Sequence, residues 1–162
     1  MNTNFTKLKI NAELEVYNSE NDLAASENDL LQRAKASANK AYAPYSNFLV
    51  GAAILLENNE IIEGNNQENA AYPSGLCAER VALFYAASKF PGIGVKAIAV
   101  ACKIQSQEVA SPCGACRQAI AEYEVRFNKP IRIIMAGQND KVFVAPSIES
   151  LLPLMFNAKH LK

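Results

Sequence analysis

Two short cysteine motifs constrain this chain more than any other feature of its sequence. Cys77 begins the run CAER, and Cys113 and Cys116 lie later in the run PCGAC. Residues three positions apart lie on one side of a helix, so Cys113 and Cys116 can both ligate one metal ion. With Cys77 they offer three ligands, whereas a structural zinc site uses four. Three thiols therefore predict a catalytic zinc with one position left for water.

Glu79 supports this interpretation through its distance from Cys77. Residues two apart on a helix do not face each other, so Glu79 is poorly placed to ligate the ion that Cys77 holds. Its longer side chain can reach a water on the metal and carry its proton, as a general acid/base does. A ligand, any residue and Glu, followed by Pro-Cys-x-x-Cys, is the signature of the zinc deaminases. Cysteine is the first ligand here, which gives the three-cysteine variant.

Four motifs together resemble one family. In chain order they are residues 43–48 (APYSNF), 66–73 (NQENAAYP), 77–80 (CAER) and 112–118 (PCGACRQ). This set resembles the small, homotetrameric cytidine deaminases, over roughly residues 26–156. Four ordered motifs are far more specific than a single Cys-x-x-Cys pair.

The resemblance implies an activity and a cofactor. It implies hydrolytic deamination of cytidine and 2′-deoxycytidine to the uridines plus ammonia, as in pyrimidine salvage. One Zn²⁺ per subunit would be held by Cys77, Cys113 and Cys116, and Glu79 would be the catalytic proton carrier.

The resemblance also implies how a nucleoside is held. Asn66 and Glu68 would bind the ribose, and being two apart in an extended chain they point the same way. The ring of Phe48 would pack on the pyrimidine. Further contacts would come from Gln67, Tyr72 and Ala78, and from Phe156 reaching a neighbouring subunit's pocket.

Charge predicts a role for Arg80. Three thiolates and a hydroxide outweigh the two positive charges of zinc, so the expected site is net negative. The N-terminal ends of two helices, at Cys77 and Cys113, bring positive dipoles to it. Arg80, next to Glu79, is expected to add electrostatic support through charged hydrogen bonds to one or two sulfurs.

The balance of charge limits the substrate class. Lys and Arg together number 16, as do Asp and Glu, so the chain lacks a basic footprint for nucleic acid. We therefore expect a small-molecule nucleoside as partner. No apolar run approaches the ~20 residues of a membrane span, and residues 1–9 lack the apolar core of a signal peptide. The sequence thus predicts a cytoplasmic protein with reduced thiols.

Hydrophobic periodicity predicts a three-layer α/β/α fold with a mixed sheet of about five strands. Strands are expected at residues 49–56, 61–65, 96–103, 131–136 and 141–145, and helices from Ser26 to before Pro44, at 77–89 and at 113–126. Residues 5–17 alternate and predict an extra N-terminal strand. The turn of residues 137–140 is too short for a parallel crossover, so the last two strands should be antiparallel. Residues 1–25 are interpreted as an extension and residues 26–162 as the catalytic domain.

Two other functions remain open at this point. One is a deaminase of another aminopyrimidine compound, which Asn66, Glu68 and the zero net charge argue against. The other is a non-catalytic zinc-binding module, for which Cys102 could be a fourth ligand; its apolar strand instead predicts a core position. The helix after Cys77 is apolar nearly all round, which together with the resemblance predicts a homotetramer.

Overall fold

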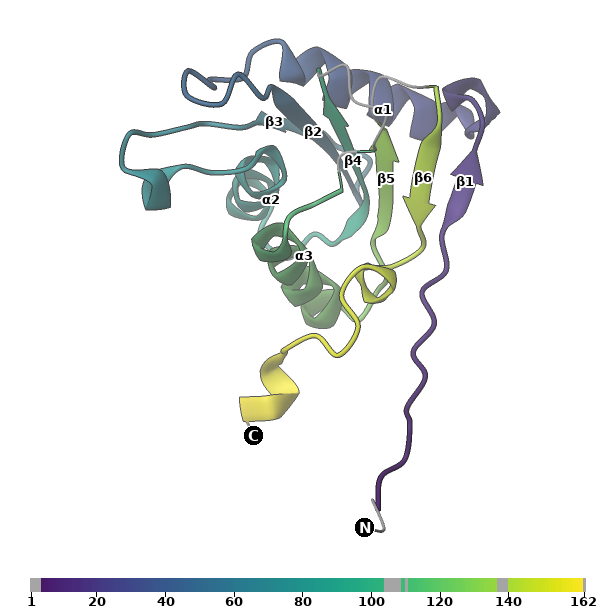
Figure 1. The fold of residues 1–162 in the computed structure, drawn as a ribbon. Helices are drawn as coiled ribbons and strands as arrows, with labels where there is room; N and C mark the ends of the chain where they lie inside the picture. Colours follow the sequence, from purple (N-terminus) through teal and green to yellow (C-terminus); the bar gives the residue numbers. More distant parts are fainter. Residues whose placement is uncertain (1–3, 104–108, 110, 137–139, 162) are drawn as a thin grey trace.

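A six-stranded sheet forms the centre of the molecule (Figure 1). The computed structural model describes residues 4–103, 109, 111–136 and 140–161. Across the sheet the strands are β1 (Glu15–Tyr17), β6 (Val142–Ala145), β5 (Arg132–Ala136), β4 (Val95–Cys102), β2 (Val50–Leu56) and β3 (Ile61–Asn65). The α-helices are α1 (Ala25–Ala38), α2 (Ala78–Lys89) and α3 (Gly114–Phe127). Four 3₁₀ turns complete the described elements: η1 (Glu20–Asp22), η2 (Tyr72–Ser74), η3 (Ile148–Ser150) and η4 (Ala158–Leu161).

The strand directions confirm the predicted mixed sheet. β4 and β5 are parallel, and every other neighbouring pair is antiparallel. The last pair, β5 and β6, is antiparallel as predicted, although residues 137–139 of the turn between them lie outside the described residues. The extra N-terminal strand is also confirmed, because β1 pairs with β6 at one edge.

Alternate residues of the central strands face two separate cores. Ile54 and Ile98 pack in the cluster that includes α2 and α3, whereas Ala53 and Ala99 pack in the cluster that includes α1. Successive side chains of a strand point to opposite faces, so each strand serves both layers. Figure 1 shows α1 covering one face of the sheet, and α2 and α3 the other. This confirms the three-layer prediction. None of the described helices combines the length and hydrophobicity that a bilayer span requires.

Helix α1 lies unusually close to the sheet. A Cβ on Gly51 of β2 would lie only 2.0 Å from the carbonyl oxygen of Ala34 and 2.4 Å from the nitrogen of Ala38. Only glycine leaves room for the helix backbone at this distance. The contact fixes β2, which begins two residues after Phe48.

The start of α1 differs from the sequence prediction. The helix begins at Ala25, one residue before the predicted start at Ser26, and Ala24 at its N-cap makes no side-chain cap. A capping box forms earlier instead, where the Ser19 hydroxyl accepts a hydrogen bond from the Asn21 N–H at 3.2 Å and begins η1. Leu23, just before the helix, and Leu30 and Leu31 within it are buried in the same core cluster.

The N-terminal strand is shorter than the alternating pattern of residues 5–17 predicts. Only Glu15, Val16 and Tyr17 pair with β6, opposite Val144, Phe143 and Val142. A strand needs a hydrogen-bonding neighbour, and β6 is only four residues long. Residues 4–14 are outside any assigned helix or strand.

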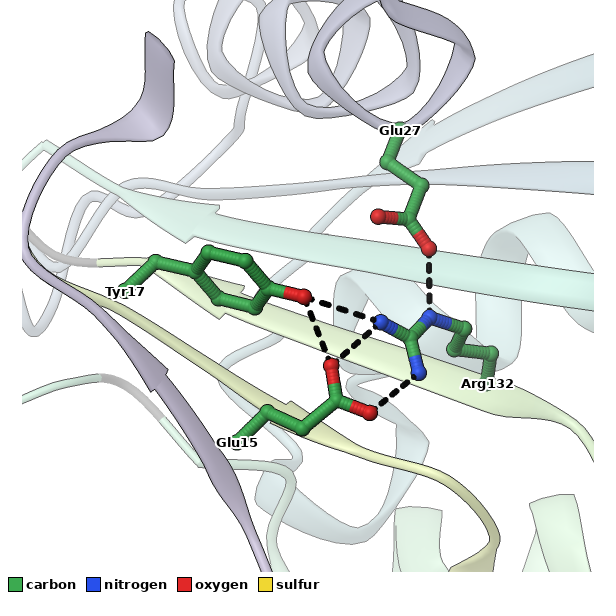
Figure 2. A network of polar contacts seen from close by, with 4 residues as sticks. All are labelled: Glu15, Tyr17, Glu27 and Arg132. Atoms are coloured by element: carbon green, nitrogen blue, oxygen red, sulfur yellow. Dashed lines mark hydrogen bonds and ion pairs between the residues drawn. The ribbon is translucent and has the colours of Figure 1, made fainter. Parts of the chain in front are cut away.

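A network of polar contacts joins β1 to the domain (Figure 2). Arg132 on β5 donates to both carboxylate oxygens of Glu15, at 2.9 and 2.6 Å, and its Nε donates to Glu27 on α1. The Tyr17 hydroxyl donates to Glu15 at 2.7 Å. Arg132, and then Tyr17, lower the pKa of Glu15 to about 2. The extension is therefore tied to both the sheet and α1.

Candidate active site

Three cysteines converge where two helices begin on the same side of the sheet. Cys77 is the N-cap of α2, Cys113 is the N-cap of α3, and Cys116 lies one turn into α3. Their sulfur atoms all lie within 4.8 Å of one another, and the Sγ atoms of Cys77 and Cys113 are 3.8 Å apart. Cys116 is buried and Cys113 is exposed, so the cluster opens toward solvent on one side. This spacing suits a single ion bound by all three.

The surroundings of the cluster favour thiolates, which are the form that binds zinc. Arg80 Nη2 lies 3.7 Å from the Sγ of Cys77. Hydrogen bonds from Cys116, and after it from Arg80, lower the pKa of Cys77 to about 5, while the bond shared with Cys77 raises the pKa of Cys116. The positive ends of α2 and α3 act in the same direction as Arg80. Three soft sulfur ligands at this spacing fit zinc.

Glu79 lies beside the sulfurs in a buried position. It is 4% exposed. Burial, and then the charge of Cys77, raise its pKa above the usual range of a glutamate. Among the buried side-chain nitrogen and oxygen atoms of the described residues, only the Nε of Arg80 lacks a hydrogen-bond partner, which places a free donor next to this site. A nearly enclosed carboxyl group beside the cluster is suited to proton transfer.

A cleft of about 530 Å³ leads to Cys77. It is lined by Tyr45, Ser46, Asn66, Gln67, Glu68, Asn69, Tyr72, Gly75, Leu76, Cys77 and Arg80. The rings of Tyr45 and Tyr72 meet edge to face at 6.2 Å between centroids. Its size and mixture of aromatic and polar groups are typical of small-molecule sites.

The side chain of Asn66 is anchored to main chain. Its Nδ2 donates to the Phe48 carbonyl at 2.8 Å, and its Oδ1 accepts from the Val50 N–H at 2.8 Å. An amide has a second N–H and a second lone pair, so one donor and one acceptor site stay free for a ligand. Asn66 thus holds the segment that presents Phe48, a residue that is 38% exposed.

Glu68 is anchored to the same segment. Its carboxylate accepts from the Tyr45 N–H at 2.9 Å, from the Ser46 N–H at 3.3 Å and from the Ser46 hydroxyl. The Ser46 hydroxyl, followed by the Tyr45 N–H, lowers the pKa of Glu68. Glu68 is therefore a fixed carboxylate on the cleft wall.

The chain matches known proteins over most of its length. The model of the family described as the cytidine and deoxycytidylate deaminase zinc-binding region matches residues 24–128. The chain belongs to this family.

Individual relatives agree with the family match. A cytidine deaminase of Halalkalibacterium halodurans is 37% identical over 131 residues, which is 80% of this chain and 93% of that protein. One from Sporosarcina psychrophila is 46% identical over 95 residues, 58% of this chain and 67% of the relative. A crystal structure of cytidine deaminase from Burkholderia pseudomallei is 38% identical, with a TM-score of 0.72, and covers 83% of this chain and all of that one.

Membership of a zinc-binding deaminase family and the three-cysteine cluster together identify the cofactor. Cys77, Cys113 and Cys116 fit one zinc ion per subunit, as the sequence predicts. Cys102 lies in β4, is 8% exposed and is not part of the cluster, which confirms its predicted core position.

The remaining predicted site residues lie at different distances from the cleft. Gln67 and Tyr72 line it, and the Gln67 side chain donates to Asn65 at 2.6 Å. Ala78 is fully buried at the start of α2. Phe156 is outside the cleft of its own chain, where it stacks on His160 with centroids 5.4 Å apart and is 57% exposed.

Two residues that organise this deaminase site were missed by sequence reasoning. The Ser46 hydroxyl donates to Glu68 and accepts from the Phe48 N–H at 3.0 Å. Arg117 donates to the Pro112 carbonyl at 2.7 Å, the Ser111 hydroxyl at 2.7 Å and the Leu151 carbonyl at 2.8 Å, and so holds the loop before Cys113. Both lie inside the family motifs, which was the available signal.

Proposed function

We propose that this chain catalyses the hydrolytic deamination of cytidine and 2′-deoxycytidine to uridine and 2′-deoxyuridine, with release of ammonia. One observation carries the proposal. Three sulfurs lie within 4.8 Å of one another beside the carboxyl group of Glu79, a residue that is 4% exposed, and Cys77 of this cluster lines a cleft of about 530 Å³. This pairs a metal site with a proton carrier beside a space that fits a nucleoside.

The carboxyl group of Glu79 moves protons in the proposed reaction. Zinc, when bound by the three thiolates, polarises water and so supplies a nucleophile for ring carbon 4 of cytosine. Glu79 accepts a proton from that water and delivers it to ring nitrogen 3. It then takes the second proton of the added water, from the hydroxyl now on carbon 4, and passes it to the exocyclic amino group; the carbon–nitrogen bond breaks, ammonia leaves and carbon 4 becomes a carbonyl. One water is consumed, and Glu79 returns to its starting state.

The cleft wall positions the nucleoside. Asn66 and Glu68 hold the ribose hydroxyls with the hydrogen-bonding capacity that their main-chain contacts leave free. The ring of Phe48 stacks on the base, and Gln67, Tyr72 and Ala78 complete the substrate contacts. Because Asn66 and Glu68 both bind the segment that carries Phe48, sugar recognition and base stacking share one support.

Arg80 gives electrostatic support to the thiolates. Its guanidinium is always charged, and its Nη2 lies 3.7 Å from the Sγ of Cys77. A cation here offsets part of the negative charge that three thiolates bring to zinc. The side chain is half-buried, so the interaction is screened less than one at the surface.

A homotetramer of cytoplasmic catalytic domains is part of the same proposal, with residues 26–162 as the domain and residues 1–25 as its extension. On α2, Phe84 is 45% and Tyr85 54% exposed, which leaves apolar surface for a neighbouring subunit. Phe156 then lies at another subunit's cleft. Light scattering at micromolar concentration should give four subunits, and a monomer would refute the assembly. Growth of a pyrimidine auxotroph on cytidine, with the activity in the soluble cell fraction, would support salvage in the cytoplasm.

Metal analysis combined with turnover tests the function. The purified protein should contain one zinc per chain and convert cytidine to uridine and ammonia. Cys113→Ala should lose most of its zinc and its turnover, while Cys102→Ala, which removes a thiol outside the cluster, should keep both. Stoichiometric zinc without turnover of any nucleoside would indicate a non-catalytic zinc-binding module. Turnover of a different aminopyrimidine compound that is faster than turnover of cytidine would indicate a deaminase of that compound.

A further inference from the structure

The N-terminal arm, residues 4–14, is an extended segment that is exposed along its whole length. It continues the line of β1 and runs away from the sheet, as Figure 1 shows. Its large hydrophobic side chains are exposed: Phe5 by 68%, Leu8 by 78%, Ile10 by 47% and Leu14 by 37%. The arm lies before the region that the family model matches, residues 24–128. A row of exposed apolar side chains of this kind indicates an interaction surface.

The arm leads into the open edge of the sheet. β1 is an edge strand of the sheet. One of its sides pairs with β6, and none of the other described strands pairs with its opposite side. An open edge presents unpaired N–H and C=O groups that a further strand can bind. The root of the arm is already fixed, because Arg132 holds Glu15 by two hydrogen bonds (Figure 2). Pairing therefore orders only the residues before β1.

The charges of the arm are arranged symmetrically about Asn11. On one face of the extended chain stand Lys7, Lys9, Asn11, Glu13 and Glu15. Going outward from Asn11, every lysine on one side matches a glutamate at the same distance on the other. The opposite face carries Leu8, Ile10, Ala12, Leu14 and Val16. Such a sequence is complementary in charge to an antiparallel copy of itself.

We propose that two copies of this chain pair through their N-terminal arms as antiparallel strands, related by a twofold axis at Asn11. In this register Lys9 lies opposite the partner's Glu13, and Lys7 opposite the partner's Glu15. On the other face Leu8 lies opposite the partner's Leu14. Opposite charges and apolar pairs that face each other across strands both stabilise a sheet. The interface is isologous, as a twofold dimer requires.

The register keeps the apolar faces of both arms on one side. Even-numbered residues pair only with even-numbered residues, so the apolar side chains form one continuous ribbon. In each copy the arm already lines a groove of about 640 Å³ along the C-terminal segment, through Leu8 and Ile10 and also through Asn11 and Glu13. If one arm shifted by one residue, its apolar side chains would lie on the same face as the partner's charged side chains. The pattern of side chains therefore strongly specifies this register.

Joining two sheets makes the pairing stable. A two-stranded ribbon alone is marginal in water. Here each arm extends a six-stranded sheet, and the partner's arm also covers the open edge of β1. The inference is independent of the proposed activity, because no residue of the arm lines the cleft that leads to Cys77.

Disulfide trapping tests the pairing in the zinc-loaded full-length enzyme. Asn11→Cys places two thiols directly opposite each other across the axis, at the ~5 Å separation that a disulfide spans. Mild oxidation should then give a covalent dimer that reductant dissolves. Lys7→Cys is the matched control on the same exposed arm, because its two copies would lie about 27 Å apart. The unmodified chain, oxidised in the same way, shows how much covalent dimer forms through the native cysteines.

Charge exchange in the Asn11→Cys chain tests the register. Lys9→Glu puts like charges opposite each other at two places in the dimer and should slow trapping roughly tenfold. Adding Glu13→Lys restores opposite charges and should restore the rate. Equal trapping of Asn11→Cys and Lys7→Cys, or no trapping of either, would overturn the pairing. Failure of the double exchange to recover would overturn the register. Cytidine turnover, measured in parallel, reports on the active site separately.

Discussion

The side-chain amide of Asn66 donates a 2.8 Å hydrogen bond to the main-chain carbonyl of Phe48. Asn66, which is proposed to bind the ribose, thereby supports Phe48, which is proposed to stack on the base.

Asn66→Ala removes this bond and the one from Val50, so we expect a KM for cytidine raised roughly 10- to 100-fold. Turnover of free cytosine should fall less, because free cytosine has no ribose for Asn66 to bind. The control is Asn58→Ala between β2 and β3, outside the residues that line the cleft, whose side chain accepts a hydrogen bond from the Glu60 N–H at 3.2 Å. Equal losses for cytidine and cytosine would give Asn66 a purely structural role.

Glu79→Gln tests the proton carrier. Gln has nearly the same shape as Glu but cannot accept and deliver a proton, and Glu79 is not one of the clustered ligands. The variant should keep its fold and its zinc while kcat falls at least about 10²-fold. Zinc analysis, circular dichroism and the rate of uridine formation measure the three quantities. Normal turnover in a zinc-loaded variant would remove Glu79 from the mechanism.

Arg80→Gln tests the support given to the thiolates. Loss of the charged donor near Cys77 should leave zinc bound but less tightly, so a chelator should extract it faster than from the unmodified enzyme. Arg80→Lys keeps the charge without the planar fork and should be intermediate. Identical extraction rates in all three proteins would show that the helix termini alone stabilise the site.

Gly64→Ala tests the contact between β3 and the start of α2. A Cβ at Gly64 would lie 2.6 Å from the nitrogen of Ala82 and 2.8 Å from the carbonyl oxygen of Ala78, so the first turn of α2 must shift. We expect a loss of about 1–3 kcal/mol in the free energy of unfolding, together with weaker zinc binding. Gly94→Ala is the comparison, since its Cβ meets only side-chain atoms, the nearest at 3.2 Å. Urea unfolding of both variants decides, and equal stability would contradict the prediction.

Glu15→Gln tests the network that holds β1. The pKa of Glu15 is lowered from 4.5 to about 2 in the folded chain, so its contribution is complete above pH 4.5 and is lost as the pH falls toward 2. At neutral pH the variant should therefore unfold at a lower urea concentration than the unmodified chain. The difference between the two urea midpoints should become smaller as the pH falls. Because the Glu15 side chain is 45% exposed, solvent screening limits the effect to ~1 kcal/mol. Glu60→Gln on the exposed β2–β3 hairpin is the control. A difference that does not change with pH would refute the charge-based account.

Local patterns in the sequence determined most of the secondary structure and the identity of the metal ligands. The alternation in β2 and β4 and the antiparallel last pair follow from side-chain periodicity and a short turn, which are properties of neighbouring residues. The predicted boundaries of 61–65 match β3, and those of the helices after Cys77 and Cys113 lie within one residue of α2 and α3. The cysteine spacing likewise predicted zinc, because it reports the residues available in one helical turn.

Contacts between residues distant in sequence were decided only by the tertiary structure. The resemblance implied that Asn66 and Glu68 bind the ribose, yet both also bind main chain near Phe48, about twenty residues away. The three-residue length of β1 and the link from Arg132 to Glu15 depend in the same way on which surfaces meet. A local pattern fixes which conformations a segment favours. The choice of partner depends on packing free energy across the whole domain, which no single segment contains.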